Sequence, residues 1–171
     1  MLKRFCYVFF ILLIFMLLTS CKSENSQGTL KIYPDYVAKG FVEISSNKTI
    51  SKYSFYEKRV DGKIEAEFQK DDRKIKITKE NGKVILDGKD LKNIAEDIFL
   101  EYYINKLVNS EKYSIVKQEK YTIITIELKD DIRYLHYYFE NESLKKIVVI
   151  YQDARFIKTI YLTEYKKYRK G

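Results

Sequence analysis

Cys21 is the residue whose type and surroundings point most directly to a chemical reaction. It follows Leu18, Thr19 and Ser20, and a leucine with two small residues before a cysteine forms the lipobox pattern. In that pattern the thiol becomes a diacylglycerol thioether, and cleavage leaves the lipidated cysteine as the first residue. The sequence therefore predicts lipidation of Cys21. Its acyl chains would hold the mature protein at a membrane, since each buried methylene adds about 0.8 kcal/mol.

Residues 1–20 have the layout of a secretory signal. The charged pair Lys3 and Arg4 precedes an apolar run over residues 5–18. This run is shorter than the roughly 20 residues that a spanning helix needs. We therefore expect residues 1–20 to be removed and Cys21 to lie at the extracytoplasmic face of a membrane. Two alternatives stay open, namely an ordinary signal peptide with an incidental cysteine and an uncleaved amino-terminal helix.

Few other residues suit covalent or metal chemistry. After the signal, Cys21 is the only cysteine and His136 the only histidine. A zinc site built from Cys and His, a Cys-His pair and a disulfide are therefore excluded. His136 lies in an aromatic run without a nucleophile motif, so we expect it to face solvent or a neighbouring hydroxyl. With no phosphate loop or dinucleotide fingerprint, we expect no catalytic residue, cofactor or metal.

Two adjacent carboxylate pairs, Asp71-Asp72 and Asp130-Asp131, are candidates for metal or acid/base chemistry. Both pairs lie between predicted strands, where aspartate favours turns. A site would need further ligands from other strands, whereas a turn needs none. We therefore interpret both pairs as turn residues.

The composition is that of one domain with its own core. Without residues 1–20 the chain keeps 151 residues, and its 30 basic and 24 acidic residues give a charge of +6. This balance favours an anionic membrane or cell-wall polymer only weakly, and export disfavours nucleic acid as a partner. We expect residues 21–29 to be the lipidated cysteine with a flexible polar tether, and residues 30–171 to form a single domain.

Strands are predicted by period-two alternation of Val, Ile, Tyr and Phe. Asn81-Gly82 is the strongest hairpin signal, because a type I′ turn needs positive φ at both central residues. Gly40 indicates a bulge. In residues 73–79 we expect Ile75 and Ile77 to face inward. The expected strands cover residues 36–45, 50–59, 63–69, 73–79, 84–86, 121–128, 132–139, 144–151 and 155–162, with another near 113–118.

A change of period predicts a single helix after the signal. Apolar residues from Leu91 to Leu107 fall mostly three or four apart, and Asp90 is a plausible N-cap. Because this stripe must bury against the sheet, we expect an α+β fold. Its strongly curved antiparallel sheet would form a half-open barrel with the amphipathic helix over the concave face. The Tyr and Phe residues would fill the core or line an acyl groove. The basic tail from Lys166 should fray.

Several segments resemble one family. The combination of lipobox, tether, curved sheet and helix looks like the lipoprotein-carrier superfamily of half-open barrels typified by LolA and LolB. Within it, the chain resembles the clostridial germination lipoproteins of the GerS type. Proline-bearing segments of that family are replaced here by the tight turn at residues 59–63, so no partner-contacting residue is carried over. The resembling segments are residues 42–49, 53–57, 99–103, 146–151 and 157–161.

This resemblance implies a non-enzymatic lipoprotein that binds and activates an N-acetylmuramoyl-L-alanine amidase of the CwlD type. Such an amidase helps make the muramic-δ-lactam of spore cortex, which is recognised at germination. An exposed strand edge or sheet face would dock the enzyme at the forespore membrane. The alternatives are a fixed acceptor for lipid or lipoprotein that uses an apolar groove, and an envelope sensor or wall-binding module. Edge strands in such folds can exchange between protomers, so a homodimer also stays open.

Overall fold

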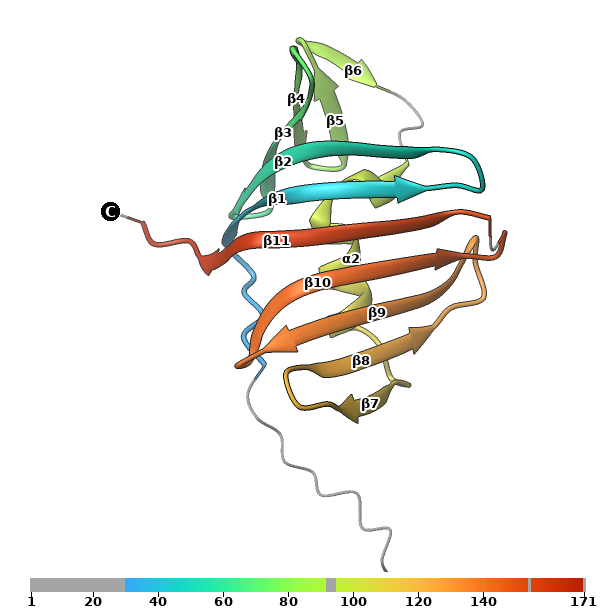
Figure 1. The fold of residues 1–171 in the computed structure, drawn as a ribbon. Coiled ribbons are helices and arrows are strands. Elements are labelled where there is room, and N and C mark those ends of the chain that lie inside the picture. The colour runs from blue at the N-terminus through green and yellow to red at the C-terminus, as the bar shows by residue number, and fades with distance from the viewer. Residues whose placement is uncertain (1–29, 92–94, 154, 171) are drawn as a thin grey trace, which may run out of the picture.

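The computed structural model describes residues 30–91, 95–153 and 155–170. Within these residues one antiparallel sheet runs in the order β6-β5-β4-β3-β2-β1-β11-β10-β9-β8-β7 (Figure 1). The central pair joins β1 to β11, so the first and last strands lie side by side. The strands are β1 (Tyr36–Ser45), β2 (Ile50–Val60), β3 (Lys63–Lys70), β4 (Arg73–Glu80), β5 (Lys83–Leu86), β6 (Lys89–Leu91), β7 (Ser114–Lys117), β8 (Thr122–Glu127), β9 (Ile132–Glu140), β10 (Ser143–Tyr151) and β11 (Ile157–Lys167).

Two sequence signals for the sheet are confirmed. Asn81 and Gly82 have φ values of 50° and 75°, as the predicted type I′ turn requires. The register between β1 and β11 shifts at Gly40, where the bulge was predicted. A Cβ at Gly40 would lie only 1.8 Å from the carbonyl oxygen of Tyr161, so this close approach of two backbones requires glycine.

The concave face of the sheet carries the helical segment. The 3-10 turn η1 (Glu96–Ile98) leads into α2 (Leu100–Val108). Figure 1 shows α2 behind the central strands, so the viewer looks at the convex face. This arrangement confirms the predicted fold class, an α+β half-open barrel with one amphipathic helix over its concave face.

The predicted start of the helix is wrong. Asp90 is not an N-cap, because it lies in β6, and Leu91 pairs with Val84 of β5. Asp87 and Gly88 both have positive φ and turn the chain back into this short strand, which interrupts the helical period. Ile94 lies outside the described residues. The helix begins only at Leu100.

Two smaller predictions are also corrected. Ile77 is buried, but Ile75 is 47% exposed because β4 extends beyond the part of the sheet that the helical segment covers. The tail does not fray from Lys166, because β11 continues to Lys167, which pairs with Tyr36 at the start of β1. The long first strand therefore orders the end of the chain.

Buried side chains form two clusters on the concave side. The larger cluster joins β1, β2 and β8–β11 to α2, and the smaller one lies between β3, β4 and the residue before α2. The smaller cluster consists of Ile64, Ala66, Ile77 and Phe99. The larger consists of Tyr36, Ala38, Val42, Phe55, Leu100, Tyr103, Ile104, Ile124, Ile126, Ile132, Leu135, Tyr137, Phe139, Leu144, Ile147, Val149, Ile160 and Leu162.

Candidate functional site

The residues singled out from the sequence are widely separated. Cys21 lies outside the described residues, so its lipidation stays a prediction. Asp71 has a φ of 51° in the turn between β3 and β4, as expected of a turn residue. Asp130 lies in the connection between β8 and β9, where it pairs with Lys106 of α2. No group of metal-ligating side chains that could hold an ion occurs among the residues described.

His136 behaves as predicted for a strand residue. Its Nδ1 lies 2.8 Å from the hydroxyl of Thr125 on the neighbouring strand β8. Partial burial lowers the pKa of His136, which favours the neutral ring. The hydrogen bond thus links two outward-facing strand residues, and no nucleophilic arrangement results.

A buried carboxylate holds the start of α2 to the sheet. Glu57 of β2 is 1% exposed. Its two oxygens accept hydrogen bonds from the backbone N–H groups of Leu100 at 2.8 Å and Glu101 at 3.1 Å, and the Tyr36 hydroxyl donates at 2.5 Å. The first N–H groups of a helix have no partner within the helix. A carboxylate that accepts hydrogen bonds from them stabilises this end, as a capping side chain does. Burial raises the pKa of Glu57 to about 7, and the hydrogen bonds offset only part of that rise.

Glu101 extends this attachment to two further strands. It accepts a hydrogen bond from Arg59 of β2 at 3.0 Å and from Lys79 of β4 at 2.9 Å. Arg59 also donates to the backbone carbonyl of Pro34, which precedes β1. The first turn of α2 is therefore tied to β2 and β4 by charged side chains.

Asp97 of η1 forms a second attachment on the other side of the helical segment. Its side chain accepts a hydrogen bond from the Tyr151 hydroxyl at 2.9 Å, and the ammonium group of Lys158 lies 3.6 Å away. Its backbone carbonyl accepts from the Tyr103 hydroxyl and from Lys158. Burial lowers the pKa of Lys158, while Asp97 opposes that change. Sequence reasoning missed Asp97, because nothing in the neighbouring sequence indicates its distant partners Tyr151 and Lys158.

These attachments hold α2 against the central part of the concave face. Leu100, Tyr103 and Ile104 are each at most 3% exposed and belong to the larger cluster. Where α2 lies against the sheet, the described side chains form a packed core, which is one of the two alternatives left open by the sequence. An acyl chain bound there would have to displace α2 and its polar attachments.

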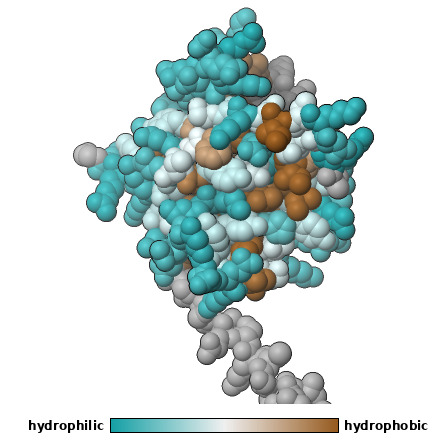
Figure 2. Space-filling view, viewed as in Figure 1, coloured by the Kyte–Doolittle hydropathy of each residue, from teal (hydrophilic) through white to brown (hydrophobic). Residues whose placement is uncertain are grey.

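The convex face exposes apolar side chains at one end of the central strands. Ile50 is 70% exposed and Ile157 is 39% exposed. Ser45 pairs with Ile50 on one side and Ile157 on the other, so both isoleucines project from the same face. Figure 2 shows apolar side chains gathered on the half of this face that lies toward the β1–β2 turn. We call Ile50 and Ile157 the Ile50 patch.

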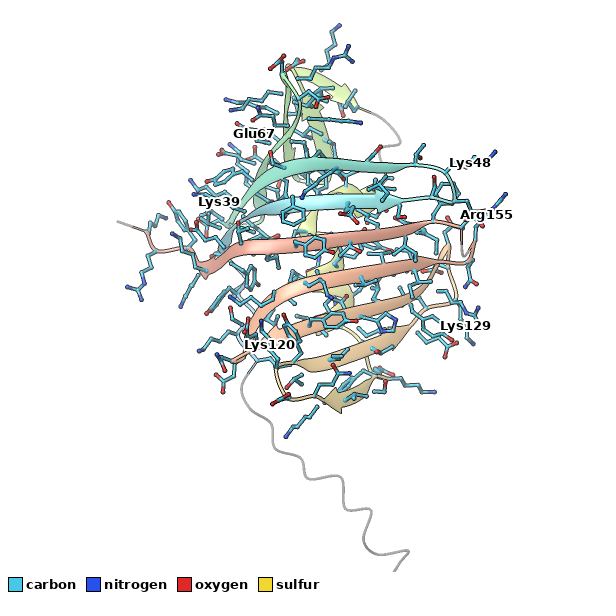
Figure 3. All side chains as sticks on the ribbon, viewed as in Figure 1. Lys39, Lys48, Glu67, Lys120, Lys129 and Arg155 are labelled. Carbon is cyan, nitrogen blue, oxygen red and sulfur yellow. The ribbon has the colours of Figure 1, made fainter. Side chains whose placement is uncertain are left out.

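Basic side chains border the Ile50 patch. Figure 3 places Lys48 and Arg155 at the same end of the molecule. Lys52 follows Ile50 on the same face of β2, and its ammonium group lies 3.8 Å from the centre of the Phe41 ring. Within the described part of the chain, Lys48 and Lys52 have no ion-pair partner, whereas Arg155 pairs with Asp153. The patch thus fits a partner surface with an apolar centre and an acidic border.

The described residues contain no helix that is long and apolar enough to cross a membrane.

No family model matches the chain, and no curated protein matches it. Solved structures with a similar fold include the MucA/MucB complex of Pseudomonas aeruginosa, at 11% identity and a TM-score of 0.43 over 77% of this chain and 51% of that one. They also include a DUF1329 family protein from Desulfovibrio piger, at 10% identity and a TM-score of 0.36, over 83% and 88% of the two chains.

A third similar structure is a putative outer membrane lipoprotein-sorting protein domain from Vibrio parahaemolyticus, at 7% identity and a TM-score of 0.30. It is matched over 86% of its length by 80% of this chain. This chain spans about half the length of the MucB structures. The fold assignment rests on the strand order and register described above.

Proposed function

We propose that this chain is a non-catalytic binding protein that a lipid on Cys21 holds at the extracytoplasmic face of a membrane, and that the Ile50 patch docks a protein partner. The observation that supports this most is the exposure of two isoleucines on either side of Ser45, with Ile50 at 70% and Ile157 at 39%. Large apolar side chains that converge at the surface of a soluble domain usually serve binding. The polar border would add partner selectivity.

The partner that we propose is a cell-wall amidase of the CwlD type, which the chain would activate during formation of spore cortex. This choice rests on the resemblance of the sequence to the germination lipoproteins. It requires an amidase surface with an apolar depression and acidic residues around it, complementary to Ile50 and Lys52. The chain itself would hydrolyse nothing, in keeping with the structural roles of the buried Glu57 and the half-buried Asp97.

Binding and turnover should be measured with the purified chain from Lys22 onward and a purified CwlD-type amidase. We expect a complex on size-exclusion chromatography, faster amidase turnover in the mixture, and no turnover by the chain alone. Ile50→Glu should weaken binding at least about tenfold, because it places a charge in the apolar centre of the interface. Ile75→Glu is the matched control, since Ile75 is also exposed but lies on β4.

Three results would count against the proposal. Peptidoglycan hydrolysis by the chain alone would show that it is an enzyme. If Ile50→Glu and Ile75→Glu weakened amidase binding equally, binding would not depend on the Ile50 patch. Acyl lipid that co-purifies with the chain, without amidase binding, would favour the acceptor alternative with a displaced α2.

A further inference from the structure

The first and last described segments of the chain meet at one end of the sheet. Lys31 forms a bridge with the first residue of β10, and Tyr36, which begins β1, lies opposite Lys167 of β11. The backbone N–H of Tyr168 donates to the carbonyl of Asp35 at 3.0 Å. Figure 1 shows both segments at the end opposite the β1–β2 turn. We call this end of the sheet, formed by residues 31–36 and 165–170, the entry end.

Basic side chains are concentrated at the entry end. Val37 pairs with Lys58 of β2 on one side and with Lys166 of β11 on the other, so both lysines project from the same face. The ammonium group of Lys58 lies 4.9 Å from the centre of the Tyr168 ring. Residues 166–170, which we call the basic segment, contain no acidic residue. Their four basic residues are Lys166, Lys167, Arg169 and Lys170.

Acidic side chains neutralise only part of this charge. Lys166 pairs with an acidic residue of β11, and Lys170 lies 3.8 Å from Asp61. The second contact is exposed at both partners, and such ion pairs contribute little. In the part of the chain that the structure describes, the exposed Lys167 and Arg169 form no ion pair. The basic segment therefore presents positive charge to whatever faces the entry end.

The opposite end of the sheet has a more balanced charge. Lys129 and Arg133 flank the pair Asp130-Asp131, so the turn between β8 and β9 carries no net charge. Figure 3 places Lys129 and Lys48 at this end, away from the entry end. The ten residues of β1 separate the two ends by roughly 33 Å. Charge thus distinguishes one end of the molecule from the other.

The length of the predicted tether limits what can face the entry end. Residues 21–29 span at most about 30 Å when fully extended. With a lipid on Cys21, the entry end would lie within that distance of the membrane surface. Anionic lipids attract Lys and Arg near the surface, by roughly fivefold in affinity for each residue. A second copy of the chain does not fit the same place, because two basic segments would repel each other.

We propose that the basic segment binds the head groups of anionic phospholipids beside the lipid on Cys21. The inference rests on the proposed lipid anchor for its position and is independent of the amidase partner. One acyl chain with a basic patch holds a protein more firmly than the chain alone. This second contact would orient β1 away from the membrane. The Ile50 patch, at the other end of that strand, would then face away from the membrane toward a partner.

Vesicle flotation of the chain from Lys22 onward tests the basic segment without the anchor, since this chain has no cysteine. At low ionic strength it should float with vesicles of phosphatidylglycerol and phosphatidylcholine, and salt should release it. It should not float with phosphatidylcholine alone. Lys167→Gln with Arg169→Gln should weaken binding about 30-fold. Lys129→Gln with Arg133→Gln, which removes the same charges at the opposite end, should weaken it less than about threefold.

A tryptophan reporter tests the orientation. The chain contains no tryptophan, so Tyr168→Trp places a single indole in the basic segment and Phe156→Trp places one between β10 and β11 at the opposite end. Each variant, begun at Cys21, would be coupled through that thiol to a maleimide lipid in phosphatidylglycerol vesicles. Energy transfer to dansyl groups on the lipid head groups should be greater from Tyr168→Trp. Equal transfer from both positions would contradict the proposed orientation.

Other outcomes would overturn the proposal, provided that circular dichroism shows folded variants. Equal weakening by the two double glutamine variants would mean that the whole chain binds through its net charge. Absence of flotation with phosphatidylglycerol vesicles, or equal flotation with phosphatidylcholine, would remove the recognition of anionic lipid. Tighter binding of soluble poly(glycerol phosphate), at equal phosphate concentration, would assign the segment to a wall polymer. Lipidation of Cys21 is measured separately, by incorporation of labelled palmitate in cells.

Discussion

The two wings of the sheet differ in how much they bury. From β1 across β11 to β8, the inward side chains form the larger cluster with α2. In β3 to β6, which we call the β3–β6 wing, burial is limited to Ile64, Ala66 and Ile77, with Phe99 laid against them. β4 contains one buried residue among its eight. The difference implies that the larger cluster sets global stability, while the β3–β6 wing opens locally at lower free energy.

The largest effect should come from the larger cluster. Phe139 of β9 is 1% exposed, and Phe139→Ala should lower the free energy of unfolding by about 3–5 kcal/mol, because it removes a buried ring and leaves a cavity. Urea denaturation followed by circular dichroism measures this change. Phe156→Ala, at an exposed phenylalanine, should change it by less than about 0.5 kcal/mol. Equal effects would contradict the division between core and surface.

The next effect depends on pH and concerns Glu57, where the two regions meet. Because burial raises the pKa of Glu57 to about 7, the folded state binds a proton more readily than the unfolded chain. The preferential protonation of Glu57 in the folded state therefore adds up to about 3 kcal/mol to the free energy of unfolding. This contribution is fully present below about pH 4.5 and is lost as the pH rises through about 7.

Urea denaturation from pH 4.5 to 8 should therefore show a smaller loss of stability in Glu57→Gln than in the unmodified chain, since the amide carries no charge. Glu43→Gln, at a half-buried site on the convex face, is the control and should follow the unmodified chain. Parallel pH curves for Glu57→Gln and the unmodified chain would show that Glu57 does not titrate in this range.

A smaller and local effect should follow from a change within the β3–β6 wing. Ile77→Ala should cost about 2 kcal/mol, the lower end for such a cavity, because only three other residues form its cluster. Hydrogen exchange should increase in β3 to β5 while β9 and β10 keep their protection. Ile75→Ala on the same strand should leave exchange unchanged. Uniform deprotection of all strands would mean that the two regions unfold together.

The smallest effect should come from the ion pair that ties the β3–β6 wing to α2. Lys79→Gln removes the 2.9 Å contact with Glu101 and should cost about 1 kcal/mol, because the pair is only partly exposed and Arg59 still neutralises the carboxylate. Hydrogen exchange of β4 measures the loss. Lys76→Gln, whose weak contact with Glu67 is 3.9 Å long, is the control. No difference between them would show that Phe99 alone attaches the wing.

Most of the sheet could be predicted because each strand carries its own pattern. Ile64, Ala66 and Phe68 alternate with polar residues, and the turns at Asp61-Gly62 and Asn81-Gly82 have positive φ at both positions. Such signals need only neighbouring residues. The turn at Asp87-Gly88 carries the same signal, and reading it would have predicted a strand at Leu91 and a later start for the helix.

The arrangement of the site could not be predicted, because it depends on partners distant in sequence. Glu57 occupies an inward position between Phe55 and Arg59, where alternation alone suggests an apolar residue. Its burial is explained only by the backbone of Leu100 and Glu101, more than forty residues later. The Ile50 patch likewise exists because β1 pairs with both β2 and β11, which brings Ile50 and Ile157 to either side of Ser45.

The central pair of strands also determines when the protein can finish folding. β1 is made first during synthesis, but the strand that completes its pairing, β11, is made last, with Tyr36 opposite Lys167. Contacts between distant parts of a chain slow folding, since a long loop must close before they form. A chain that emerges amino terminus first therefore keeps β1 open on one side until nearly its whole length is free. Such a delay would suit the export that the sequence predicts, because the sheet closes only after the last strand has arrived.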